Sequence, residues 1–226
     1  LIEADLAFVD PVSSTLVCKD EYLSGNVRTK LAQAKQHADA NIEFERNVKA
    51  LETVVPVELV PEQIEVQLGA SWLAPTVIEQ FIESITEQRK AVHYADATAM
   101  WSVDAGHVYG DAAATKVWGT DSLNFYQLVE RMLNAADLTI HKIIEVDGKE
   151  IRKVDQESSA SVREKAEAVR EAFKKWLWED KDRSSYLCSL YNNLYNSVVN
   201  RKFDGSHLVI PGLSAAITLR DAQKDS

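Results

Sequence analysis

Two short basic clusters carry the residue types best suited to binding phosphate. The stretch SGNVRTK places Asn26, Arg28 and Lys30 at the expected start of a helix, with Ser24 as its expected cap. Free backbone N–H groups at a helix start favour anions. The three side chains are therefore candidates for contact with DNA phosphates, a contact that needs cations but no unique motif.

The second cluster is NRKFDGSH, which places Arg201, Lys202 and His207 just after an expected helix end. These residues are further candidates for phosphate contact. Cations near a helix C-terminus also have a purely structural reason to be there, because they offset the negative end of the helix dipole. Both interpretations stay open for this cluster.

Residues typical of a catalytic centre form no recognisable constellation. The histidines are scattered, and none pairs with another at metal-ligand spacing. The acidic residues lie on expected helix faces, where a solvated surface explains them best. The sequence contains no phosphate loop, dinucleotide fingerprint or nucleophile elbow. We therefore predict that this chain is not itself an enzyme and holds no metal or cofactor; a hydrolase or nuclease is the least favoured alternative.

The tryptophans separate into core and interface candidates. Trp176 falls on the apolar stripe of an expected helix, so we predict that it is buried. Trp178 falls off that stripe, which makes it a candidate for an interface with another domain.

Composition limits the function classes. The 226 residues include 25 Lys and Arg against 35 Asp and Glu, a net charge of −10. This balance argues against a protein that coats nucleic acid with its whole surface, but it allows a local basic patch. No apolar run is long enough to span a membrane, and no signal peptide is visible. Cys18 and Cys188 are predicted to be reduced thiols in a cytosolic protein.

The expected elements give an α+β fold, helix-dominated with small antiparallel hairpins. Hairpins are predicted within residues 8–17 and around the Asp147-Gly148 turn, which suits a tight primed turn, and residues 91–95 and 99–103 are two further strand candidates. An extended segment is predicted over residues 64–68, where apolar residues alternate and Gly69 follows.

Four helix assignments carry further expectations. Pro75 suits a first helical position, Asp121 is the expected cap of the helix after it, and Ser161 with Glu164 matches a capping box. The last helix is expected to bury one apolar face. Its members are Leu187, Leu190, Tyr191, Leu194, Tyr195 and Val198.

Several phrases together resemble a known kind of protein. They include EYLSGNVRTKLAQA, VWGTDSLNFYQLVERMLN, REKAEAVREAFKKWLWEDKDRSSYL, YNNLYNSVVNRKFDGSHLVIPGLS and ITLRDAQKD. In this order they resemble the region upstream of the helicase core in very large N6-adenine DNA methylase–helicase fusion proteins. Phages, plasmids and integrated mobile elements encode such proteins, whose helicase is Swi/Snf-like and of superfamily two; some members act in antirestriction or restriction–modification.

The resemblance implies a division near the end of the sequence. Leu219, Arg220 and Gln223 resemble the L-R-x-x-Q phrase that begins such a helicase domain, although Asp221-Ala222 replaces the family's Pro-His pair. Residues 1–218 are then expected to be a connector or accessory domain, with a possible sub-boundary near residues 90–120. Residues 219–226 would be the truncated start of the helicase domain.

The resemblance also implies a role. The chain is expected to be a non-catalytic connector or DNA-guiding domain, whose partners are DNA and the adjoining helicase and methyltransferase domains. The parent would use ATP with Mg and S-adenosylmethionine in the bacterial cytoplasm. The alternative is a protein–protein docking module that positions helicase lobes or a partner subunit without touching DNA; the net acidity favours this alternative.

Overall fold

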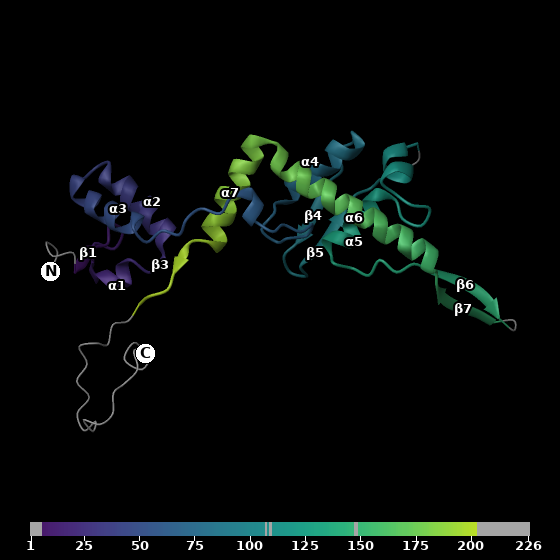
Figure 1. Cartoon of the computed structure of the whole chain (residues 1–226), viewed down its shortest axis with the longest axis horizontal. Helices are drawn as coiled ribbons and strands as arrows, with labels where there is room; N and C mark the ends of the chain where they lie inside the picture. Colours follow the sequence, from purple (N-terminus) through teal and green to yellow (C-terminus); the bar gives the residue numbers. More distant parts are fainter. Residues whose placement is uncertain (1–5, 107, 109, 147–148, 203–226) are drawn as a thin grey trace, which may run out of the picture. The chain divides into compact units, whose positions relative to one another are not determined.

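The computed structural model describes residues 6–106, 108, 110–146 and 149–202. The chain forms two compact units, shown in Figure 1. Unit 1 consists of residues 1–60 and 188–226, and unit 2 consists of residues 61–187. These boundaries cannot be read from composition, because unit 1 is built from both ends of the sequence. Residues 90–120, where a sub-boundary was expected, lie inside unit 2.

Helices dominate, and the strands of the described residues pair in four two-stranded antiparallel sheets. The α+β class predicted from the sequence is therefore confirmed. The Asp147-Gly148 turn lies outside the described residues, but the strands on either side of it pair as predicted.

Unit 1 is a small helical body with two short sheets. Its elements are β1 (Ala7–Val9), β2 (Leu16–Cys18), α1 (Lys19–Tyr22), β3 (Gly25–Asn26), α2 (Val27–Ala38), η1 (Ile42–Phe44), α3 (Glu45–Glu52) and β8 (Val198–Val199). β1 pairs with β2, and β3 pairs with β8. The core centres on Phe8 and Tyr22, whose rings stack 5.1 Å apart between centroids. The buried amide of Asn47 donates to the Tyr22 hydroxyl, so the polar atom at the core centre is satisfied.

Unit 2 packs three helices around an aromatic core. Its elements are η2 (Pro61–Gln63), α4 (Pro75–Thr86), β4 (Val92–Ala95), β5 (Met100–Val103), the π-helix η3 (Ala113–Val117), α5 (Phe125–Leu133), β6 (His141–Val146), β7 (Lys149–Val154) and α6 (Gln156–Glu179). Phe81 of α4 contacts Phe125 of α5 and both Phe173 and Trp176 of α6. The chain leaves unit 2 within α7 (Lys181–Tyr195).

Three predicted helix starts are wrong, because in each case a different residue caps the helix. Asn26 rather than Ser24 caps α2 by accepting the Thr29 N–H. Asn124 rather than Asp121 caps α5, where it forms a capping box with Gln127. The third is α6, which begins five residues before Ser161 and is capped by Asp155.

The predicted buried face of the last helix is also wrong in part. Leu187 is buried, whereas Leu194, Tyr195 and Val198 are exposed. The position that α7 buries in unit 1 is polar: Asn192 is almost completely covered. Its role is described below, because it shares hydrogen-bond partners with one of the candidate site residues.

Candidate functional site

Arg28 is committed to the interior of unit 1. Its Nε donates to the Asn196 carbonyl at 2.8 Å, and one terminal nitrogen donates to the Pro56 carbonyl at 2.8 Å. The other terminal nitrogen lies 3.1 Å from Glu58, and only 11% of the side chain is exposed. The guanidinium therefore ties the residue that follows α7 to residues 56–58, and phosphate contact by Arg28 stays a prediction without support from this geometry.

Two asparagines, Asn192 on α7 and Asn196 just after its end, complete this arrangement. Asn192 accepts the Leu59 N–H at 2.9 Å and donates to the Leu59 carbonyl at 3.0 Å, which imitates pairing with a strand. Asn196 donates to the Val57 carbonyl at 2.7 Å. Neither residue was a candidate from the sequence. The signal that could have indicated them is the spacing of two asparagines at i and i+4, which places both on one helix face.

Lys30 and Asn26 are likewise used within unit 1. The Lys30 ammonium donates to the carbonyls of Glu21, Tyr22 and Ser24 at 2.8–3.1 Å. Desolvation by burial lowers the pKa of Lys30. The side-chain oxygen of Asn26 accepts the Thr29 N–H as the cap of α2. The structure thus brings the three residues of the first predicted cluster close together, but each is engaged by the chain itself.

The second predicted cluster is only partly described. Arg201 lies 3.7 Å from Glu21 and 3.4 Å from the Cys18 sulfur, and 39% of its side chain is exposed. Lys202 is exposed. His207 and the helicase-start residues Leu219, Arg220 and Gln223 lie outside the described residues. Phosphate contact by Arg201 and Lys202 stays a prediction.

The two tryptophans of α6 are both half-buried, so the full burial predicted for Trp176 is not found. Trp176 packs on Phe81 and Phe173, and the Arg183 guanidinium lies 3.7 Å from its ring centroid. Trp178 is half-buried. Its role as an interface residue stays a prediction.

The most prominent basic feature is the β6–β7 hairpin of unit 2. Figure 1 shows both strands projecting beyond the start of α6, and every described side chain of β7 is exposed. Side chains alternate between the two faces of a strand, and directly paired residues share a face. The register pairs Lys142 with Lys153 and Ile144 with Ile151, and it places Lys149 on that same face.

We call this the lysine face, made of Lys142, Ile144, Lys149, Ile151 and Lys153. The two paired strands contribute no acidic residue to it. The opposite face consists of His141, Ile143, Glu145, Glu150, Arg152 and Val154. Three lysines therefore lie on one face of the hairpin, and both carboxylates of the two strands lie on the other face, beside Arg152.

The hairpin is anchored at its base to the start of α6. The Asp155 N–H donates to the Ile140 carbonyl at 2.8 Å, and the Ser159 hydroxyl accepts the Ile140 N–H at 2.8 Å. Asp155 accepts the Ser158 N–H as the cap of α6 and lies 3.5 Å from the Lys142 ammonium. The Ser158 N–H and Lys142 lower the pKa of Asp155. These contacts fix the direction in which the hairpin leaves the helix.

Sequence reasoning identified the hairpin but not its lysine face. The signal was available, since Lys149, Ile151 and Lys153 alternate with other residues along one strand. Placing Lys142 on the same face also requires the pairing register of β6 with β7, and this register is set by the turn between the two strands.

The described part of the chain contains no group of three or more His, Cys, Asp or Glu side chains placed to hold a metal ion. It also contains no helix that is both long and apolar enough to cross a membrane.

Comparison with known proteins gives one finding. A protein-family model described as Domain of unknown function (DUF8437) matches residues 67–197. That range includes most of unit 2, with the β6–β7 hairpin, and continues through the end of α7, so that it includes Asn192 and Asn196. Comparisons with the curated proteins and with the solved structures give no match.

Proposed function

The chain belongs to the DUF8437 family of domains of unknown function, and from this premise we propose that it is a non-catalytic accessory domain that contacts duplex DNA. In this proposal it connects the methyltransferase and helicase domains of a larger enzyme and guides DNA between them. The resemblance in sequence supports the enzyme context. The lysine face of the β6–β7 hairpin supports the contact with DNA.

The lysine face suits DNA for geometric and electrostatic reasons. A two-stranded β-ribbon fits the major groove of B-form DNA. Lysines contact phosphate oxygens without regard to base sequence, which is what a guiding surface requires. Because the chain as a whole carries a net charge of −10, DNA is repelled from most of the surface, and the local cluster of cations selects the orientation of approach.

The exposed faces of the hairpin are covered by no other element among the described residues. A two-stranded hairpin alone is only marginally stable in water, and the two isoleucines of the lysine face lie between its cations. Ile151 is exposed, and Ile144 is partly covered. Contact with a groove wall would cover these apolar side chains while the lysines reach the flanking phosphates.

Duplex binding by charge-matched variants tests the proposal. We expect the complete chain to bind a fluorescein-labelled duplex of about 20 base pairs at low salt, as followed by anisotropy. The variant K142E/K149E/K153E should lose most of this affinity. The control K116E/K175E/K181E changes the net charge equally but alters exposed lysines elsewhere in unit 2, and it should retain most of the affinity. Equal losses in the two variants would show that net charge alone governs binding.

A second candidate function, docking on a partner protein without DNA contact, is favoured by the opposite face of the hairpin. Ile143 is 68% exposed there, and the nearby Val154 is 42% exposed. Exposed apolar side chains of this kind are typical of interaction surfaces when they form a patch. The variant I143S/V154S should then lose association with the adjoining helicase domain while DNA binding is unchanged.

The remaining features of the proposal come from the resemblance. The parent enzyme would use ATP with Mg in its helicase and S-adenosylmethionine in its methyltransferase. It would act in the bacterial cytoplasm in phage or mobile-element defence or in antirestriction. Sequencing the gene beyond Ser226 tests this context, because a phosphate loop should follow within a few dozen residues.

A further inference from the structure

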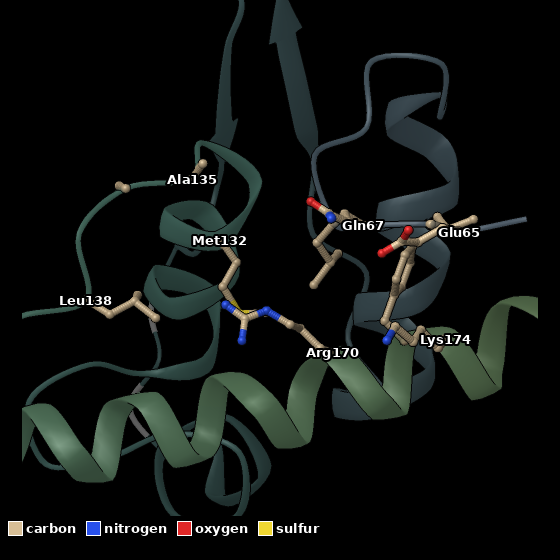
Figure 2. A pocket seen from close by; sticks show the side chains of 11 residues that line it. Glu65, Gln67, Met132, Ala135, Leu138, Arg170 and Lys174 are labelled. Atoms are coloured by element: carbon tan, nitrogen blue, oxygen red, sulfur yellow. The ribbon is translucent and has the colours of Figure 1, made fainter.

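A second feature of unit 2, separate from the hairpin, is a cleft of about 450 Å³. Figure 2 shows its three sides: residues 65–68 form one wall, Met132, Ala135 and Leu138 lie on the other, and α6 forms the floor. The volume lies within the range of ligand-binding pockets. None of its lining residues belongs to the lysine face.

Both walls of the cleft contain backbone that pairs with no strand among the described residues. Residues 64–67 belong to no helix or strand, and Leu68 begins a turn; Ile64, Val66 and Leu68 are buried while Glu65 and Gln67 are exposed, the alternation of an extended segment, and they pair with no strand among the described residues. The backbone N–H groups of Glu65 and Gln67 donate to no described residue. Residues 136–138 on the other wall are likewise outside every described sheet. Unpaired extended backbone beside a cleft is the arrangement that accepts an added strand.

The cleft is lined by polar and apolar side chains together. Val66 and Leu68 contribute from one wall, Met132 from the other and Phe173 from the floor. These four side chains are buried in unit 2, whereas Ala135 and Ala136 are exposed and Leu138 is half-buried, so the accessible apolar surface of the cleft lies on the wall formed by residues 135–138. An incoming peptide could place alternate apolar side chains on this surface.

The charges on the floor indicate the character of the occupant. Arg170 and Lys174 lie at i and i+4 on α6, so both reach the cleft from one helix face. Among the residues that the structure describes, each pairs with an acid three residues earlier on the same helix: Arg170 lies 2.6 Å from Glu167, and Lys174 lies 3.3 Å from Glu171. Such exposed pairs are weak, so a carboxylate that enters the cleft can compete for the cations.

The two cations are not equivalent. In Figure 2 Glu65 lies on the same side of the cleft as Lys174, whereas Arg170 reaches toward Met132 on the opposite wall. An incoming carboxylate would be repelled by Glu65 near Lys174. Arg170 also offers a planar fork of donors that matches a carboxylate with two parallel hydrogen bonds.

We propose that this cleft binds an extended acidic peptide of a partner protein. The peptide adds a strand beside residues 65–67, places apolar side chains against Ala135 and Leu138, and pairs a carboxylate with Arg170. This role requires neither the hairpin nor DNA.

Peptide binding by the complete chain tests this inference. The probe is a fluorescein-labelled peptide of about seven residues in which valine and glutamate alternate, a length typical of a strand. We expect a saturable rise in its anisotropy, and no binding of the matching valine–lysine peptide. The variant R170E should weaken binding at least about ten-fold, whereas K175E, which alters an exposed lysine of α6 outside the cleft, should change it less than about two-fold.

Backbone pairing has its own control. A strand offers its N–H groups to one edge at every second residue, so two forms of the probe are N-methylated at alternate positions. At least one form should fail to bind. The inference is overturned if both bind as tightly as the parent peptide, if the glutamate peptide shows no saturable binding, or if R170E and K175E behave alike. The hairpin variant K142E/K149E/K153E should bind the peptide normally, which separates this result from the test of DNA contact.

Discussion

At the scale of single residues, the basic side chains of unit 1 illustrate how residue type and role can diverge. Arg28 and Lys30 have the chemistry of phosphate ligands, yet both donate to backbone carbonyls of their own unit. A guanidinium that satisfies two carbonyls, from segments far apart in the sequence, acts as a structural crosslink. We therefore expect its replacement to affect stability before it affects any binding property.

Arg28→Ala should lower the free energy of unfolding by about 2 to 4 kcal/mol, because two carbonyls lose their donors and Glu58 loses its partner. Urea denaturation monitored by circular dichroism measures this change. Lys35→Ala is the control, since it removes only an exposed ion pair with Glu52 and should cost less than about 1 kcal/mol. Equal costs for the two variants would contradict the structural role of Arg28.

Gly69 is a second residue whose type is required by the fold. Its φ is +87°, and a Cβ added there would lie 2.1 Å from the Leu133 carbonyl oxygen. Gly69→Ala should therefore lower the stability of unit 2 by at least about 2 kcal/mol, through backbone strain and displacement of the end of α5. Gly110→Ala is a matched control: its φ is also +87°, but a Cβ there would meet no atom within 4 Å. The difference between the two variants in thermal unfolding isolates the steric part, and no difference would rule it out.

At the scale of elements, the start of α6 connects a helix cap to the base of the hairpin. Asp155 caps the helix through Ser158 and lies beside Lys142 of β6. Because these contacts favour the charged carboxylate, the pKa of Asp155 is lowered from its ordinary value of 3.8. Protonation of this one group therefore weakens both the helix start and the hairpin anchor.

The sign of the pH effect follows from the lowered pKa. A carboxyl whose pKa is lower in the folded state contributes stability that is fully present above its unfolded value, here 3.8, and is lost as the pH falls through the folded value. Amide hydrogen exchange in the first turn of α6 should therefore show weaker protection below about pH 4. Asp155→Asn keeps a side-chain acceptor but cannot titrate, so its protection should lack this step. An unchanged step in the variant would assign the effect to another group.

The same elements show what sequence patterns can predict. The α4 stripe and the buried face of α6 were predictable because each repeats apolar residues at helical spacing over several turns. The buried position on α7 was not, because Asn192 is buried through hydrogen bonds to Leu59, 133 residues away in sequence. The cap of α5 was missed because Asp121 and Asn124 are both good caps, and only the local turn decides between them.

At the scale of the whole molecule, the sequence indicated the fold class but not the units. Unit 1 joins residues 1–60 to residues 188–226, and such a division depends on contacts between distant segments. The lysine face likewise depends on which residues of different segments are paired. The basic clusters were visible as short phrases, whereas the lysine face became visible only when the register placed Lys142 beside Lys153. A strongly acidic chain can thus hold a local basic face that its composition conceals.

The salt dependence of DNA binding tests the central proposal most directly, because it counts the phosphates that are contacted. The logarithm of the affinity for a duplex falls with the logarithm of the salt concentration, by about 0.9 for each phosphate neutralised. If the three lysines of the hairpin each contact a phosphate, K142E/K149E/K153E should reduce this slope by roughly 2 to 3, while K116E/K175E/K181E leaves it nearly unchanged. Identical slopes for the unaltered chain and the hairpin variant would contradict DNA contact by the β6–β7 hairpin.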